Sequence, residues 1–186
     1  MFFFQSTDKD LTFKSRSIEH AYLALLEDDL KSAGAVFETI DSPRAKWGEC
    51  LVQILEGYLK VFPTYFQIRN FLEIDLDFLL KNEKIDYVER VLDALDVLSG
   101  VNEETYKYAA RVMFENGYNN VAIKYLEKSK RLFYKDPELH FMLTKYYLKT
   151  GDFEKANFYV NECLRILPDY YPAKLLKDEV SRYVKQ

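Results

Sequence analysis

The sequence predicts an all-α protein, a superhelix (solenoid) of about ten helices in antiparallel pairs with no strands. Two observations lead to this prediction. Apolar residues recur at helical spacing along most of the 186 residues, and only six Gly and five Pro interrupt them. The pattern also repeats with a period of about 34 residues. A period of this length accommodates two helices and a turn, so the repeating unit is one helix pair.

The period is clearest when Gly151 is aligned with Gly117. Both glycines follow an apolar-periodic run and suit the end of a helix, where a left-handed backbone is common. Small and apolar residues then coincide along the second run of each repeat: Ala122 with Ala156, Leu126 with Val160, Ser129 with Cys163, and Leu132 with Ile166. The alanines are suited to a position where two helices approach closely.

The period predicts three frames: 69–102, 103–136 and 137–170. Each frame contains one apolar-periodic run, a short break and a second run. In the first frame Asn82 takes the place of the two glycines, and Asp75 stands at a position where the pattern favours an apolar residue. The repeat is therefore best defined in the last two frames.

Further helices are expected outside these frames. Residues 1–68 hold a degenerate helix pair at about 14–43 and an odd helix at 44–60 that has no partner in the same register. Residues 171–186 form a C-terminal capping helix with charges on one side. The apolar MFFF start lies outside the repeats. We expect it to fold back on the first helices, and docking on a neighbouring copy is the alternative.

With these features the sequence resembles the tetratricopeptide repeat. The match is best in 137–170, where family positions are occupied by Leu143, Tyr147, Gly151, Ala156 and Pro168. The departures there are His140, Thr144 and Val160. The resemblance implies a right-handed superhelix whose first helices line a concave groove. It also implies a non-catalytic scaffold or adaptor that binds a peptide or a partner helix of another protein in that groove.

The family's groove positions can be carried over residue by residue. Those in the first frame are polar or acidic, and those in the next two frames mix cations, acids and aromatic rings. The predicted partner-binding residues are Asn70, Glu73, Asp77, Glu104, Lys107, Tyr108, Arg111, Glu138, Phe141 and Lys145.

Three of these residues predict a basic row. Lys107 and Arg111 lie one helical turn apart on one face, and Lys145 follows Arg111 by one repeat period. With Tyr108 and Phe141 beside it, the row would read an extended segment that carries acidic and apolar groups. The alternative is a solvated helix face whose charges have no such role.

Charge and composition narrow the classes of partner. The net charge of −4 argues against nucleic acid as a partner. Residues 1–102 carry −7 and the rest carry +3, which suits a bipolar molecule that steers a charged partner or stacks on itself, or is a chance imbalance on solvated faces. A self-associating structural subunit, such as a homodimer, is therefore an alternative function. The resemblance to helical repeat proteins adds a second alternative, a chaperone-like holder of an aggregation-prone client.

Catalysis has little support in the sequence. Motifs for a nucleophile elbow, a phosphate loop or a metal site are missing, so no catalytic residue, metal or cofactor is expected. His20 and His140 are the only histidines, and both fit packed or capping positions on helices. Cys50 and Cys163 match no metal spacing and are expected to be buried thiols. No apolar run is long enough for membrane insertion, and we expect a cytoplasmic protein.

Overall fold

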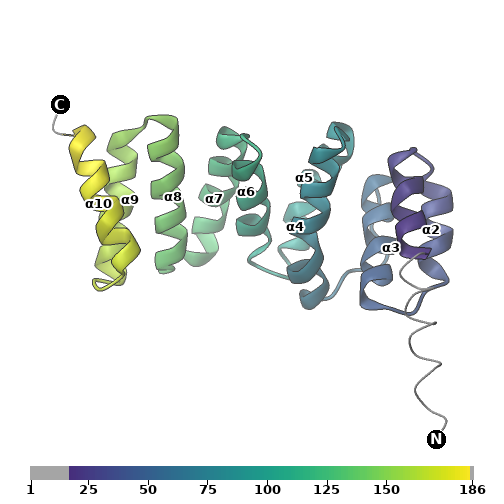
Figure 1. Cartoon of the computed structure of the whole chain (residues 1–186). Coiled ribbons are helices and arrows are strands. Elements are labelled where there is room, and N and C mark those ends of the chain that lie inside the picture. Colours follow the sequence, from purple (N-terminus) through teal and green to yellow (C-terminus); the bar gives the residue numbers. More distant parts are fainter. Residues whose placement is uncertain (1–16, 185–186) are drawn as a thin grey trace, which may run out of the picture. The chain divides into compact units, whose positions relative to one another are not determined.

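A computed structural model describes residues 17–184 of the chain (Figure 1). The all-α prediction is confirmed, because a helical segment at 17–26 and nine helices labelled α2 to α10 make up the regular structure of these residues. The chain divides into two compact units between Asn102 and Glu103, which is also the boundary between two predicted frames. The predicted right-handed superhelix concerns the path of the whole chain and stays a prediction, as do the frames themselves. The MFFF start lies outside the described residues.

The first unit begins with the helical segment 17–26. Four labelled helices follow it: α2 (Leu30–Glu38), α3 (Pro43–Leu55), α4 (Tyr65–Lys81) and α5 (Ile85–Leu98). Neighbours in the sequence pack on one another, and α3 also contacts α5. The odd helix of the sequence is therefore α3, and it packs as an extra helix against α2, α4 and α5.

The structure corrects the end of this odd helix. The sequence predicted a helix over 44–60, whereas α3 ends at Leu55. The reason is Gly57, which adopts a left-handed φ of 86°. Its N–H donates to the carbonyl of Ile54, and the N–H of Tyr58 donates to the carbonyl of Gln53, which closes the last turn. The start is set by Ser42, whose side chain accepts a hydrogen bond from the Ala45 N–H.

The second unit contains the remaining five helices: α6 (Thr105–Glu115), α7 (Asn119–Phe133), α8 (Pro137–Thr150), α9 (Phe153–Ile166) and α10 (Tyr171–Val184). Each packs on the next, and α8 also contacts α10. Many core positions one repeat period apart are buried alike. Fully buried pairs include Ala109 and Leu143, Ala122 and Ala156, Leu126 and Val160, and Ser129 and Cys163.

A buried carboxylate organises the first unit. Asp75 of α4 is only 1% exposed. It accepts a bidentate pair of hydrogen bonds from Arg44 and further hydrogen bonds from the Trp47 indole and the Tyr22 hydroxyl. Burial raises the pKa of this carboxyl, and the Arg44 guanidinium opposes that effect. Asp75 therefore joins α4 to α3 and to segment 17–26.

A second polar group joins three helices of the second unit. Glu127 of α7 accepts hydrogen bonds from the hydroxyls of Tyr147 on α8 and Tyr159 on α9, and it forms an ion pair with Lys130. Burial acts against ionisation, but these donors and the Lys130 charge hold the pKa of Glu127 below its usual value. The network fixes both tyrosine rings, which stack 5.6 Å apart.

The turns between paired helices explain the glycines of the repeat. Gly117 and Gly151 have left-handed φ values of 86° and 81°. Glu83, which follows α4 at the corresponding turn of the first unit, also has a left-handed φ of 58°. A residue with a Cβ is strained in this conformation by roughly 1 kcal/mol, and glycine is not.

We expect Glu83→Gly to raise the free energy of unfolding by about 0.5 kcal/mol, because relief of this strain outweighs the added entropy of the unfolded chain. Gly151→Ala is the matched control and should lower it by about 1 kcal/mol, since the same strain is introduced. Urea titration followed by circular dichroism measures both. A loss of stability in Glu83→Gly would contradict this explanation of the turn.

Candidate interaction surface

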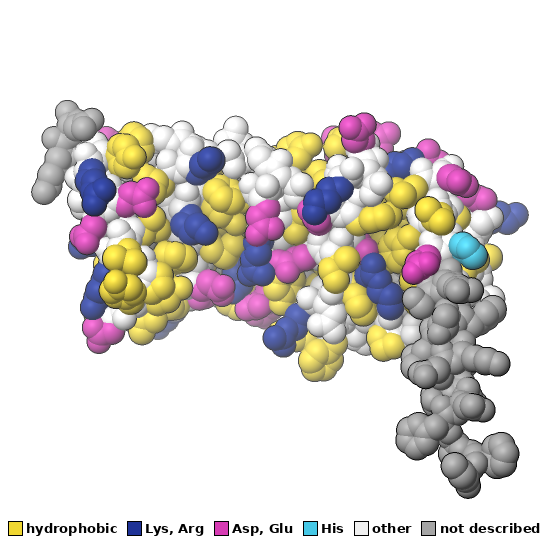
Figure 2. Space-filling model, viewed as in Figure 1, with side chains coloured by type: hydrophobic (Ala, Val, Ile, Leu, Met, Phe, Trp, Pro, Cys, Tyr) yellow, Lys and Arg dark blue, Asp and Glu magenta, His cyan; other side chains and the backbone are white. Residues whose placement is uncertain are grey.

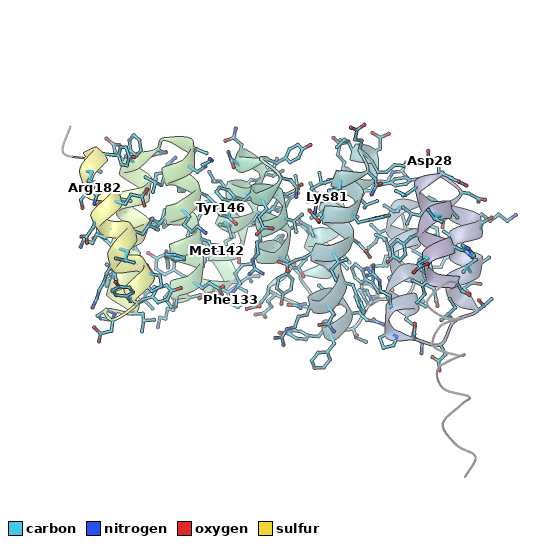
Figure 3. The ribbon with its side chains drawn as sticks, in the orientation of Figure 1. Asp28, Lys81, Phe133, Met142, Tyr146 and Arg182 are labelled. Carbon is cyan, nitrogen blue, oxygen red and sulfur yellow. The ribbon has the colours of Figure 1, made fainter. Side chains whose placement is uncertain are left out.

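The candidate site lies on the first helices of the hairpins in the second unit, α6 and α8, with α10 packed against α8. Seven of the ten predicted residues are on or next to α6 and α8: Glu104, Lys107, Tyr108, Arg111, Glu138, Phe141 and Lys145. Side chains join α6 to α8 directly. The Phe114 ring of α6 stacks on the Tyr146 ring of α8 with centroids 3.7 Å apart, and Figure 3 labels Tyr146 on its helix.

Lys107 is not the exposed cation that the sequence suggested. Its side chain is buried, with 4% of the residue exposed. The ammonium donates to Asp136 at 2.9 Å and to Glu104 at 3.0 Å, and Glu138 lies 3.7 Å away. It also lies 5.0 Å from the centroid of the Phe133 ring, which Figure 3 labels at the end of α7. Burial alone would lower the pKa of Lys107, but hydrogen bonds to Asp136 and Glu104 hold it above its usual value.

Lys107, Glu104, Asp136 and Glu138 form one group of paired charges, which we call the Lys107 cluster. Two neighbouring side chains also contact it. The buried Tyr108 hydroxyl donates to the second carboxylate oxygen of Glu104 at 3.1 Å. Arg111 is partly exposed, and its guanidinium lies 4.0 Å from a carboxylate oxygen of Glu138. The predicted basic row is therefore corrected, because one of its cations is buried among three carboxylates and another has an acidic neighbour.

Lys145 remains exposed on α8. Its ammonium lies 5.9 Å from the centroid of the Phe141 ring, one turn earlier on the helix. Phe141 is partly buried and meets the Tyr170 ring edge-on at 5.4 Å. It packs with Tyr170 on the small core of the last hairpin, formed by Val160, Cys163 and Ala173. Of the side chains predicted for the groove, Lys145 and Phe141 therefore do lie close together on α8.

Exposed apolar residues also lie at and just before the start of α10. They were not among the groove residues predicted from the family resemblance. Leu175 occupies the position one repeat period after Phe141, and 53% of it is exposed. Tyr171 and Leu167, just before it, are also exposed. Figure 2 shows hydrophobic side chains gathered over the lower end of α10 as drawn. We call Leu167, Tyr171 and Leu175 the α10 patch.

The other three predicted residues belong to α4 of the first unit. Asn70 is exposed, whereas Glu73 and Asp77 are half-buried. Asp77 forms an ion pair with Lys81 one turn later. The single groove through all three predicted frames stays a prediction.

Sequence reasoning missed two features of the first unit. One is the Asp75 cluster, although an Asp among apolar positions, with Trp47 and Arg44 upstream, was the available signal. The other is an exposed apolar surface around Phe62 and Phe66. The signal for that surface was the aromatic-rich stretch at 61–66, which surrounds Pro63 in a connection between helices.

His140 and the two cysteines occupy the packed positions that were expected, whereas the packed position expected for His20 is wrong, because His20 is exposed on segment 17–26. His140 is fully buried, its Nε2 lies 2.6 Å from the Tyr134 carbonyl oxygen, and its ring stacks on Tyr159. Cys50 and Cys163 are free, buried thiols, and burial raises the pKa of each to about 11. Among the described residues, no group of three or more His, Cys, Asp or Glu side chains is arranged to hold a metal ion. No helix in the described range has the length and apolar character needed to span a bilayer.

Comparisons with known proteins give little beyond this geometry. No family model matches the chain, and no curated protein matches it. A solved structure described as the crystal structure of MamA protein is similar over 92% of this chain and 88% of that chain. The two share 17% sequence identity with a TM-score of 0.46. The structure thus shows an all-α fold of packed helix pairs, and the tetratricopeptide resemblance stays an interpretation of the sequence.

We expect Lys107→Ala to lower the free energy of unfolding by about 3 kcal/mol, because it leaves Asp136 and Glu104 without their buried partner. Lys145→Ala, at an exposed position of the same unit, should change it by less than about 0.5 kcal/mol. Urea unfolding measures both values. Equal effects of the two substitutions would contradict the buried position of Lys107.

The same cluster predicts a pH dependence. The folded pKa of Lys107 is raised, so its contribution to stability is complete below the ordinary lysine value of 10.5 and is lost as the pH rises through the folded pKa. The stability difference between the wild type and Lys107→Ala should therefore shrink above about pH 10.5. Urea titrations at pH 8 and above pH 10.5 measure this change, and a difference that grew at high pH would contradict the assignment.

Proposed function

We propose that this protein is a non-catalytic scaffold or adaptor that binds a segment of another protein on the α8–α10 surface of its second unit. The observation that carries the proposal is the α10 patch, where three large apolar side chains are exposed within a short stretch of chain. Exposed apolar surface of this kind commonly marks a protein-binding site. Phe141 and Tyr170 extend it toward the exposed Lys145.

The chemistry of this surface favours a segment with apolar anchors and an acidic group. Leu175 and Tyr171 would contact apolar side chains, and Lys145 would pair with a carboxylate beside them. The net charge of +3 after Asn102 adds a weak attraction for an acidic segment. The Lys107 cluster takes no direct part, because its charges are already paired within the protein.

The burial of Lys107 also favours the second candidate function, a chaperone-like holder of an aggregation-prone client. Such a client would be held through apolar contacts with little help from charge. The two functions differ in salt dependence, since an ion pair at Lys145 is screened by salt and apolar contacts are not.

The proposal is tested by capture of partners from a lysate of the native organism, with identification by mass spectrometry. We expect a protein that binds the wild type to be lost with Leu175→Glu and reduced with Lys145→Glu. Phe158→Glu is the matched control, because Phe158 is also 53% exposed but lies on the second helix of its hairpin, α9. It should leave capture unchanged.

Each variant is first checked for a wild-type circular dichroism spectrum and unfolding midpoint. Capture that survives both Leu175→Glu and Lys145→Glu would contradict the proposed surface. Repeating the capture across a salt series separates the two candidate functions: a complex lost at high salt supports the acidic segment, and a salt-resistant complex that still requires Leu175 supports the apolar client.

A further inference from the structure

A second surface, in the first unit, is independent of the proposed site. A cleft of about 490 Å³ lies between the starts of α3 and α4. Its apolar lining includes Pro43, Phe66 and Phe71, and polar residues such as Asp41, Lys46 and Asn70 also line it. Phe66 is 66% exposed, although exposing a phenylalanine ring to water costs free energy relative to burying it.

The connection before α4 and the first residue of α4 carry further exposed apolar side chains. Val61, Phe62 and Tyr65 are all exposed, and the Tyr65 ring meets the Phe66 ring edge-on. The connection itself is well anchored, because Gln53 accepts hydrogen bonds from the N–H groups of Lys60 and Val61. Exposure of these rings is therefore a property of a fixed part of the unit.

The register of the first helices shows which part of the chain enters this region. Segment 17–26 runs parallel to α4, since the Tyr22 hydroxyl donates to Asp75 and Asp28 pairs with Lys84. These partners are 53 and 56 residues apart in sequence. The same offsets place Ser17 level with residues 70 to 73, beside the cleft. In Figure 1 both helices begin at the lower end of the unit as drawn.

The residues that precede Ser17 have the composition that fits the cleft. They lie outside the described residues, and their sequence from 1 to 16 is MFFFQSTDKDLTFKSR. Phe13 is four residues before Ser17, so an extended chain could reach up to about 13 Å from Ser17 toward the start of α4. This segment has three Lys/Arg against two Asp/Glu, whereas residues 17–102 have eight against sixteen. A segment of +1 thus adjoins a body of −8.

We propose that the segment around Leu11 and Phe13 docks in the α3–α4 cleft of the same chain, with the Phe13 ring against Phe66 and Phe71. The docked segment covers the exposed rings and adds a positive charge to an acidic unit. It also makes the cleft an intramolecular site: an outside segment of similar chemistry binds there only by displacing residues 11–14.

A photocrosslinking amino acid at position 13 tests this proposal in the full chain. With p-benzoylphenylalanine in place of Phe13, irradiation of the monomer should give crosslinks to residues 43–46 or 66–71, read by mass spectrometry. The yield of these crosslinks should not depend on protein concentration. Crosslinks confined to other regions would overturn the proposal. So would crosslinks to the cleft that form only between chains, which would assign the cleft to a second copy.

A matched pair of substitutions checks that the cleft itself is responsible. Phe66→Ser in the same crosslinking chain should lower the yield of the cleft crosslink at least fivefold. Phe158→Ser, which removes an exposed phenylalanine of the second unit, should leave the yield unchanged. Both positions are exposed, so neither substitution removes a core side chain. An unchanged yield with Phe66→Ser would overturn the proposal.

Discussion

The first unit depends on one buried carboxylate. Asp75 receives hydrogen bonds from Tyr22, Arg44 and Trp47, so three helical segments meet at a single side chain. The Arg44 guanidinium is also held between the rings of Tyr22 and Phe71, at 4.7 and 4.8 Å from their centroids. Removing the carboxylate would leave a partly buried cation and an indole N–H without partners. This arrangement explains how an odd helix is accommodated in a chain of helix pairs.

Buried polar clusters also decide what the surface of the second unit has to offer a partner. The Lys107 cluster joins α6 to the start of α8, and its charges are satisfied within the protein. Binding through Lys107 would require breaking these contacts, at a cost that surface pairs do not carry. The surface that we propose for a partner is therefore mainly apolar at Phe141, Tyr171 and Leu175, with the exposed Lys145 beside Phe141.

Much of the fold could be predicted from the sequence, because helical periodicity, Gly117 and Gly151 are local signals. The sequence predicts an end for α3 that is too late, because the helical pattern of apolar residues continues past Gly57, where the backbone stops the helix. The surface was harder to predict. Whether Lys107 faces solvent depends on Asp136 at the next helix start, and whether Asp75 is buried depends on Arg44, 31 residues away. The spacing of residues within one helix predicts neither the burial of Lys107 nor that of Asp75.

The most direct measurement of the central claim is a double-mutant cycle between Arg44 and Asp75, read from urea unfolding. Arg44→Met and Asp75→Leu should each lower the free energy of unfolding by about 3 kcal/mol. The double variant should lose at least about 2 kcal/mol less than their sum, because removing both partners leaves no uncompensated charge. Losses that add within about 0.5 kcal/mol would show that the two side chains act independently, and would contradict an Asp75 carboxylate that holds the first unit together.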